Sequence, residues 1–422
     1  MTEVLEYALT AIVEEPDIDS SSARASAITV TNTSDSGPGS LREAVSIAAP
    51  GDTIVFSNSI LPATITLFSG PITINKTLTI NGPGRDRIII SGFSDRIFII
   101  AGRTNVTISD ITFVNGTSSD PGGAIDNRGA VVNITRCNFS NNTSFTSGGA
   151  VANSIVCCFF AGTVNISNSS FDNNRSNYGG AIGSFSGGTV NVTNSTFSNN
   201  SADNNGGAIV NDGTVNVTNT LFSGNTASVY GGAIANIGTA TLTRCNFSGN
   251  TTPSSSGAVA NISNRTSIIN CTFSTNSSNF GGAIGNFILG TIDISNSTFS
   301  NNSSGSSGAA IVNDGTATVI RCTFTGNIAS GDGGAIANDG TISITFSTFN
   351  LNIAAVSGGA LTNLNPGTAT ISNCTFTENS ALNGGAIANF SFNTVTVTKS
   401  TFSGNSQPAI VGSVTVTNST MS

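Results

Sequence analysis

The sequence is dominated by a motif that returns every 25 to 27 residues. The tetrad Gly-Gly-Ala-Ile, or a close variant of it, begins eleven times between Gly122 and Gly384, with a single longer interval of 31 residues. A second motif, Phe-x-x-Asn, follows the same period from Phe139 to Phe402. Two motifs locked to one period predict a row of like structural units, each stacked on the next.

Each unit is predicted to hold three short β-strands. Segments such as 214–219, 239–243 and 394–398 alternate apolar and polar side chains with a period of two and are rich in β-branched residues. This pattern is typical of strands with one buried face. The Ser-Thr-Phe and Gly-Ala-Ile-x-Asn segments supply two more strands, with Gly- or Asn-rich turns between them. Helical periodicity and the Leu-x-x-Leu-x-Leu run of leucine-rich repeats are both missing from the repeats. We therefore predict an all-β parallel β-helix of about fourteen or fifteen coils, on the order of 70 Å long.

The recurring side chains are expected to stack into ladders along this rod. The motif phenylalanines should form an aromatic ladder: Phe139, Phe171, Phe197, Phe222, Phe247, Phe273, Phe299, Phe324, Phe349, Phe376 and Phe402. The asparagines that close the same motif should form an amide ladder: Asn142, Asn174, Asn200, Asn225, Asn250, Asn276, Asn302, Asn327, Asn352, Asn379 and Asn405. Stacked amides satisfy one another and the backbone of the turn, so both ladders are interpreted as structural.

Five of the seven cysteines are interpreted as packing residues. Each lies two residues before a motif Phe, where other coils carry Ser or Thr, and such a position needs a small inward side chain: Cys137, Cys245, Cys271, Cys322 and Cys374. A disulfide between Cys245 and Cys271, on consecutive coils, is the less favoured alternative. Cys157 and Cys158 lie in the one expanded coil, with an insertion around residues 154–162, and their redox state stays open.

Three regions differ in composition. Residues 1–27 carry five of the eight net negative charges; they are interpreted as a disordered tail or a cleaved leader, with a short helix at 1–13 and no signal-peptide pattern. Residues 28–121 continue the strand pattern but lack the regular repeat motifs. Within them, Ser40–Ala48 has the apolar spacing of a capping helix, with Ser40 as N-cap and Glu43 completing a capping box. Residues 122–422 hold the regular repeats. Strands expected in the irregular region are 53–56, 64–67, 72–74, 78–80, 88–90, 97–100, 106–108 and 111–113.

The composition excludes several classes of chemistry. The chain has no His, which removes Ser-His-Asp and Cys-His catalysis and His-ligated metals. The net charge is −8 and the basic residues do not cluster, so the sequence provides no positively charged surface for nucleic acid. No apolar run is long enough to span a membrane. No cofactor and no metal are predicted.

The charged residues of the repeats are interpreted mostly as turn residues. Asp212, Asp314 and Asp339 recur in one Asn-Asp-Gly turn, and Arg136, Arg244 and Arg321 recur at one place before the ladder Cys. Recurrence favours a structural role, because an active site interrupts a repeat locally. The residues that do interrupt it are also interpreted as solvated turns: Asp172, Arg175, Lys76, Arg85, Asp86, Arg87, Asp95, Arg96 and Arg103.

The paired repeat motifs resemble those of the chlamydial polymorphic outer membrane proteins and related bacterial surface β-helix proteins. The segment Ser40-Leu41-Arg42-Glu43-Ala44 is similar to an N-terminal motif of large secreted β-helix proteins. Together the resemblance covers about residues 28 to 422. It implies a right-handed coil, a surface or secreted location, and a role in adhesion or surface structure.

We therefore predict a non-catalytic, extracellular or cell-surface structural or adhesive protein. Its expected partners are a surface or glycan ligand, or further copies of itself joined end to end into fibres. A carbohydrate-active β-helix enzyme, such as a polysaccharide lyase or hydrolase, is the first alternative, and it requires a groove in which carboxylates interrupt the ladders. The second alternative is an ice- or surface-binding solenoid, because the threonines after the turn glycines should stack into a row: Thr189, Thr214, Thr239, Thr291, Thr316, Thr341, Thr368 and Thr394.

Overall fold

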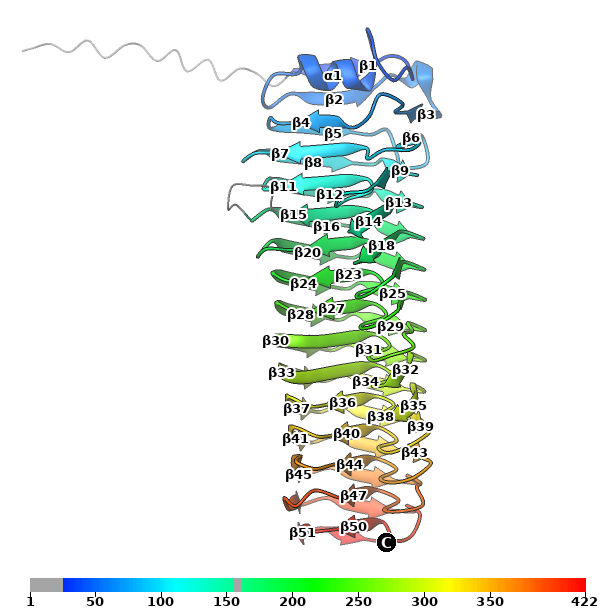
Figure 1. Ribbon diagram of the computed structural model, residues 1–422, viewed down its shortest axis with the longest axis vertical. Helices are drawn as coiled ribbons and strands as arrows, with labels where there is room; N and C mark the ends of the chain where they lie inside the picture. Colours follow the sequence, from blue (N-terminus) through cyan, green and yellow to red (C-terminus); the bar gives the residue numbers. More distant parts are fainter. Residues whose placement is uncertain (1–25, 155–160) are drawn as a thin grey trace, which may run out of the picture.

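The computed structural model describes residues 26–154 and 161–422, and they form one right-handed parallel β-helix (Figure 1). About fifteen coils stack into a straight rod, and the one α-helix among the described residues lies at the end that holds the N-terminal strands. The helix expected at 1–13 and the adjacent Cys157 and Cys158 lie outside the described residues.

One coil shows the plan of all the regular ones. In chain order it contains β23 (Ile209–Asn211), β24 (Thr214–Thr218), β25 (Leu221–Ser223) and β26 (Thr226–Ala227). The first three pair in parallel with their counterparts in the next coil, and β26 pairs with β22 of the preceding coil. The three expected strands are present, and the two-residue β26 is a fourth that the sequence pattern did not predict.

The tetrad strands and the Thr-Val strands belong to one large sheet. The tetrad strands are β11 (Ile125–Arg128), β15 (Val151–Ser154), β19 (Ile182–Ser184), β27 (Ile234–Asn236), β30 (Val259–Ile269), β33 (Ile284–Ser295), β36 (Ile311–Asn313), β40 (Ile336–Asn338), β44 (Leu361–Asn363), β47 (Ile387–Asn389) and β50 (Ile410–Gly412). In β30 and β33 the strand continues through the Thr-Val segment; elsewhere this segment is separate: β12 (Val131–Thr135), β16 (Thr163–Ser167), β20 (Thr189–Thr193), β28 (Thr239–Thr243), β37 (Thr316–Ile320), β41 (Thr341–Thr345), β45 (Thr368–Ser372), β48 (Val395–Thr398) and β51 (Val414–Thr417).

The Phe strands form a second sheet, and the short fourth strands close the remaining side. The Phe strands are β13 (Asn138–Ser140), β17 (Ser170–Asp172), β21 (Thr196–Ser198), β29 (Asn246–Ser248), β31 (Thr272–Ser274), β34 (Thr298–Ser300), β38 (Thr323–Thr325), β42 (Thr348–Asn350), β46 (Thr375–Thr377), β49 (Thr401–Ser403) and β52 (Thr420–Met421). The short strands are β10 (Thr117–Ser118), β14 (Thr143–Ser147), β18 (Arg175–Tyr178), β22 (Ser201–Ala202), β32 (Ser277–Phe280), β35 (Ser303–Ser307), β39 (Ile328–Ala329) and β43 (Ile353–Ala354).

The N-terminal coils are irregular but continue the same stack. All eight expected strands are present within a residue or two of their predicted bounds, and β1 (Ala27–Val30) is an addition. The strands are β2 (Thr53–Phe56), β3 (Ala63–Thr66), β4 (Ile72–Ile74), β5 (Leu78–Asn81), β6 (Ile88–Ser91), β7 (Phe98–Ala101), β8 (Asn105–Ser109) and β9 (Thr112–Val114).

The expected capping helix is α1 (Leu41–Ile47), which covers the end of the stack and buries Leu41, Ala44 and Val45. The Ser40 hydroxyl accepts the Glu43 amide, as an N-cap does. The Glu43 carboxylate accepts the amide of Gly39, one residue before the position that a capping box uses. The helix therefore shields apolar core that an open solenoid end would expose.

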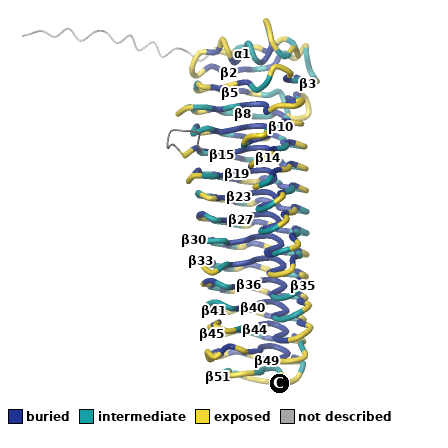
Figure 2. The backbone as a smooth tube through the Cα atoms, in the orientation of Figure 1, coloured by how far each residue is buried: buried dark blue, intermediate teal, exposed yellow. Residues whose placement is uncertain are grey.

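Aromatic rings run through the core from coil to coil. From Phe139 to Phe402 each ring centroid lies 4.7–5.0 Å from the next, with planes within 10° of parallel. All eleven rings are essentially inaccessible to solvent, and Figure 2 shows buried segments in coil after coil, with the last coil, around β51, intermediate or exposed. The coil spacing of a parallel sheet thus sets the spacing of the rings.

The motif asparagines form a continuous buried amide ladder. Each side-chain nitrogen donates to the amide oxygen of the next coil at 2.8–3.0 Å. The same nitrogen also donates to the carbonyl of the preceding coil's Phe at 2.9–3.1 Å. Because buried amides are costly when unpaired, this pairing fixes the turn of every coil.

A second amide ladder follows the tetrads and was not predicted. It occupies the second residue after the fourth tetrad position, and its amides are joined at 2.7–3.2 Å in two runs: Asn127–Asn153, and Asn211 through Asn236, Asn261, Asn286, Asn313, Asn338 and Asn363 to Asn389. Ser184 interrupts it, and the Ser184 hydroxyl is buried without a hydrogen-bond partner.

The five repeat cysteines are buried free thiols, which excludes the Cys245–Cys271 disulfide alternative. The Cys271 sulfur instead accepts the Cys245 amide at 3.4 Å. Burial raises the pKa of the Cys137 thiol to about 12 and those of Cys322 and Cys374 to about 11. These thiols are therefore protonated packing residues at neutral pH.

The corners of the coils adopt left-handed backbone conformations. The residue before each ladder Asn has positive φ; it is Asn or Gly in eight coils, and Thr275, Leu351 or Glu378 in the other three, with φ 55° at the β-branched Thr275. A side chain other than Gly or Asn is disfavoured in this region. Thr275 therefore marks a coil whose turn is less favourable than that of its neighbours.

Candidate functional site

A row of mostly small residues lies on the side of the tetrad strands away from the core, and most of its members are nevertheless buried. Within each tetrad strand the first and third residues face the core, so the middle one faces outward. The parallel register joins these middle residues from coil to coil: Ile99, Asp126, Ala152, Gly183, Val210, Ala235, Ala260, Gly285, Val312, Ala337, Thr362 and Ala388. We call this row the floor.

Two rows of turn residues border the floor. One row directly precedes the tetrads and is joined by parallel bridges: Asn205, Tyr230, Ser255, Phe280 and Ser307, then Asp332, Ser357 and Asn383. The other directly follows the position of the second amide ladder, which is Ser184 in one coil and Asn in the rest, and the backbone amides of its members donate to the previous coil: Phe185, Asp212, Ile237, Asp314, Asp339, Leu364 and Phe390. The aspartates of this row, Asp212, Asp314 and Asp339, were predicted to form turns, and they lie in that turn.

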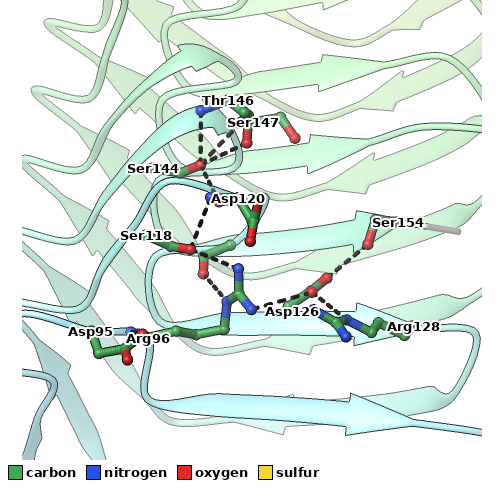
Figure 3. A network of polar contacts seen from close by, with 11 residues as sticks. Asp95, Arg96, Ser118, Asp120, Asp126, Arg128, Ser144, Thr146, Ser147 and Ser154 are labelled. Atoms are coloured by element: carbon green, nitrogen blue, oxygen red, sulfur yellow. Dashed lines mark hydrogen bonds and ion pairs between the residues drawn. The ribbon is translucent and has the colours of Figure 1, made fainter. Parts of the chain in front are cut away.

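At the N-terminal end of the floor, a buried charge network interrupts the repeat (Figure 3). Asp126 takes the place of a small floor residue and is only 1% exposed. Its carboxylate accepts Arg128 at 2.6 Å and the Ser154 hydroxyl at 2.7 Å, and it lies 3.6 Å from the Arg96 guanidinium. Asp126 and Arg128 were not singled out from the sequence, although an acid in place of a small residue was a visible signal.

Arg96 corrects the expectation that the charged residues of the N-terminal coils are all solvated turns. Its side chain is buried, and it donates to the Gly122 carbonyl at 2.8 Å and the Ser118 hydroxyl at 2.7 Å. Burial lowers the pKa of the Arg96 guanidinium, and the nearby Asp126 opposes the shift. Because each charge here has partners inside the protein, the network serves to hold the coils together.

The other charged side chains named from the sequence contact neighbouring coils. Arg136 pairs with Asp110 at 2.6 Å, and this guanidinium lowers the pKa of the Asp110 carboxyl. Arg244 donates to Asn219, and Arg321 lies over the Phe346 ring. These three arginines occupy equivalent corners and meet different partners, so they do not form one site.

The remaining interruptions are also dispersed. Lys76 donates to the Ser46 and Ala48 carbonyls near the end of α1, and Arg175 pairs with Asp203 at 2.8 Å. Within residues 26–154 and 161–422, no three acidic or cysteine side chains come together as a metal site would need.

The Thr row expected on the Thr-Val strands is interrupted. The pairing runs Thr189–Thr214–Thr239 and again Thr291–Thr316–Thr341–Thr368. Arg265, which pairs with Thr291, stands between the two runs and forms an ion pair with Asp293. A charged pair in mid-row breaks the regular flat face on which the ice-binding alternative depends.

The floor opens into a pocket at the middle of the rod. The pocket has a volume of about 360 Å³, and Val312 and Ala337 form its base. Its sides combine aromatic, hydroxyl and carboxylate groups from both turn rows: Tyr230, Ser254, Ser255, Phe280, Phe287, Ser307, Asp314, Asp339 and Leu364. Ligand-binding pockets typically have aromatic and apolar walls together with a small number of polar groups that point toward the same space.

The carboxylates of this pocket are only half-buried and have raised pKa values. Burial raises the pKa of Asp314, with the neighbouring Asp339 carboxylate as a second cause, and burial also raises the pKa of Asp339. Among the described residues, neither carboxylate has a hydrogen bond or an ion pair, in contrast to Asp126. The pocket therefore presents two carboxylates that have no partner inside the described part of the protein.

Comparison with known families identifies the repeat. The family model of the Chlamydia polymorphic membrane protein repeat matches residues 194–212, 219–237, 296–314, 321–339 and 373–389. The chain carries polymorphic membrane protein repeats. These five matches cover about a fifth of the chain. The similarity of the Ser-Leu-Arg-Glu-Ala segment to secreted β-helix proteins stays a prediction.

Each polymorphic membrane protein repeat corresponds to one defined part of a coil. A match begins at the left-handed corner residue before the Phe strand and ends at or next to the second-ladder Asn. It therefore contains the stacked Phe and both ladder amides. The family motif is thus a description of residues that hold the coil together, whereas most of the pocket residues vary between coils.

Among solved structures the similarity is distant. An alginate lyase in complex with G6 is 13% identical at a TM-score of 0.48, covering 81% of this chain and 82% of that one. A mannuronic-acid-specific family 6 lyase from human gut microbiota is 11% identical at 0.47, covering 88% and 86%. Tailspike protein 3 of bacteriophage CBA120 is 11% identical at 0.45, covering 90% and 58%. A search of the curated proteins finds no match. Likenesses of this size carry no argument about activity.

No helix in the described part of the chain is long and apolar enough to cross a membrane.

Proposed function

We propose that the chain is the rod of a bacterial cell-surface or secreted protein that binds an extended surface glycan and does not cleave it. The polymorphic membrane protein repeats support the surface location, because the family is named for membrane proteins. A stack whose coils are fixed by buried rings and amides suits a rigid spacer that presents one face along its length.

The observation that carries the binding role is the pocket between the two turn rows. The Asp126 network on the same face is paired inside the protein, whereas single buried oxygens of Ser184, Asn205 and Asp332 have no partner. In the pocket, Asp314 and Asp339 are unpaired and stand beside exposed aromatic surface, including Phe280 at 43% exposure. Aromatic faces and hydrogen-bonding groups together are what a sugar ring, with one apolar and one polar aspect, contacts.

A non-catalytic role is proposed because the groove carboxylates follow the repeat. Asp314 and Asp339 occupy the turn that also holds Asp212 in another coil, so their presence follows from turn chemistry. The charge cluster around Asp126, which breaks the repeat, is closed and buried. The hydrolase or lyase alternative requires a free acid and base in an open groove; among the pocket residues Asp314 and Asp339 would have to take those parts, and a test for cleavage products distinguishes that alternative from binding alone.

The first test measures glycan binding and glycan cleavage together. Purified protein is applied to an array of neutral, anionic and cationic glycans, and each bound glycan is then incubated with it in solution. We expect binding without new reducing ends or unsaturated products, weakened about tenfold by Phe280→Ala, which removes pocket surface. Phe346→Ala, at an exposed corner outside the pocket, is the matched control. New cleavage products would show an enzyme, and no binding to any glycan would refute the adhesive role.

The surface location has its own test. Intact cells that make the protein are treated with an external protease, and the chain is followed by immunoblot. We expect it to be degraded while a cytoplasmic marker is preserved; survival of both would contradict surface exposure.

End-to-end association of rods stays a prediction within the same proposal. Negative-stain electron microscopy over a concentration series should show filaments if rods join, whereas single rods at all concentrations would contradict fibre formation.

A further inference from the structure

The pocket in the tetrad face has the composition of a cation site. Tyr230 and Phe287 meet edge to face at a centroid distance of 5.0 Å, and Phe280 completes an aromatic surface over the floor. Aromatic faces attract cations through their quadrupole, and more strongly where water is displaced. The ring surface therefore favours a positively charged group over a neutral one of the same shape.

Two carboxylates on consecutive coils supply the matching charge. Asp314 and Asp339 occupy the same turn one coil apart, because the register pairs Asn313 with Asn338 just before them. No Lys or Arg lines the pocket within the described residues. Each charge is thus partly desolvated and faces a like charge, which is why burial and repulsion both raise the pKa of Asp314.

Asp212 shows that this pairing is not a consequence of the turn alone. It stands in the same Asn-Asp-Gly turn, but the next residue along its row is Ile237, and its carboxylate accepts the Ser186 amide at 3.4 Å. Asp212 also does not line the pocket. In the described part of this row, two acids follow each other at Asp314 and Asp339, where three aromatic rings line the same pocket.

Hydroxyl groups complete the lining. Ser254, Ser255 and Ser307 border the same hollow as the rings and the acids. Its volume of about 360 Å³ is at the small end of the range for ligand pockets and suits one or two sugar rings. A lysine side chain would use the acids and rings but would leave the hydroxyl groups without partners.

We propose that this pocket binds the protonated amine of an amino sugar within the glycan, with Asp314 and Asp339 accepting the ammonium hydrogens and the aromatic rings covering the sugar face. The inference rests on the proposed glycan-binding function and names its ligand class. It also predicts discrimination against polyuronates, because their carboxylates would meet Asp314 and Asp339 at like charge.

Calorimetric titration with a glucosamine tetramer tests the inference. At about pH 6 the amines are protonated while carboxyl groups are mostly ionised. We expect binding at least about tenfold tighter than that of the N-acetylated tetramer, and loss of this preference in the Asp314→Asn/Asp339→Asn variant. Asp212→Asn is the matched control and should keep the preference. Circular dichroism confirms that each variant is folded.

The other outcomes separate this inference from the general function. Equal affinity for both tetramers, unchanged by Asp314→Asn/Asp339→Asn, would overturn the amine site and leave glycan binding intact. No affinity for either tetramer, together with an empty glycan array, would overturn both. Equal or tighter binding of a tetralysine peptide, lost in the same double variant, would overturn the sugar assignment and identify a protein cation as the ligand.

Discussion

Truncation of one ring in the middle of the aromatic ladder is the sharpest test of how the rod is held together. Phe273 is fully buried, and its ring lies 4.7 Å from that of Phe247 and 4.8 Å from that of Phe299, almost parallel to both. Phe273→Ala removes both contacts and leaves a cavity that the neighbouring coils cannot fill, because hydrogen bonds on each side fix their spacing. A buried Phe→Ala change costs about 3–5 kcal/mol.

The expected thermal shift follows from the size of the protein. At about 2.1 cal/mol/K per residue, roughly 400 ordered residues give an unfolding entropy near 0.8 kcal/mol/K, so the loss corresponds to about 4–6 °C in Tm. Differential scanning calorimetry measures it directly. Because neighbouring coils unfold cooperatively in solenoids, the whole transition should move.

Three variants serve as controls for this prediction. Phe392→Ala, at a side chain that is 93% exposed, should leave Tm unchanged. Phe273→Leu should lose less than Phe273→Ala, because it leaves a smaller cavity. Phe402→Ala should also cost less, since its ring stacks on Phe376 alone. A shift below about 1 °C for Phe273→Ala would refute the reasoning that the ladder carries the core.

Four further predictions follow from the same structure. Asn250→Ala removes four buried hydrogen bonds of the ladder, two donated to Asn250 by the backbone and side-chain amides of Asn225 and two that Asn250 donates to the Phe222 carbonyl and the Asn276 amide oxygen, so unfolding by urea should need at least about 3 kcal/mol less free energy. Thr275→Gly relieves a left-handed corner, and the urea midpoint should rise by an amount equivalent to about 1 kcal/mol; a fall would contradict the strain. Folding raises the pKa of Asp314, so the ionised carboxylate lowers the free energy of unfolding at neutral pH. Asp314→Asn should therefore raise the free energy of unfolding at neutral pH. This gain should disappear in acid, where the wild-type carboxyl is protonated. With Cys157 and Cys158 replaced by Ser, the native protein should not react with a thiol reagent until denatured; prompt labelling would show that the buried set is accessible: Cys137, Cys245, Cys271, Cys322 and Cys374.

The period and the residue types were enough to predict the coils. Because a parallel stack places equivalent residues one above another, a residue that recurs in the sequence recurs as a row in space, as Phe and Asn of the family motif do. The strand after the ladder Asn escaped prediction because two residues, such as Thr226 and Ala227, carry no recognisable alternation. The second amide ladder has a signal of the same kind, the Asn that recurs two residues after the fourth tetrad position.

The pocket and the charge network could not be predicted in the same way. The Arg96–Asp126 pair joins an irregular coil to the first regular one, where no repeat fixes which residues face each other. The pocket depends on how the loops at Tyr230 and Phe280 lie over the floor, and these loops differ in sequence from coil to coil. Recurrence located Asp314 and Asp339 but not the rings opposite them.

The most direct test of the account is hydrogen exchange with and without the glucosamine tetramer, followed peptide by peptide. The account predicts slower exchange in residues 228–232, 253–257, 278–290, 312–315 and 337–340, which contribute the pocket, and unchanged exchange in the Phe strands on the other sheet. Protection confined to the Phe strands or to the ends of the rod would contradict a binding groove on the tetrad face.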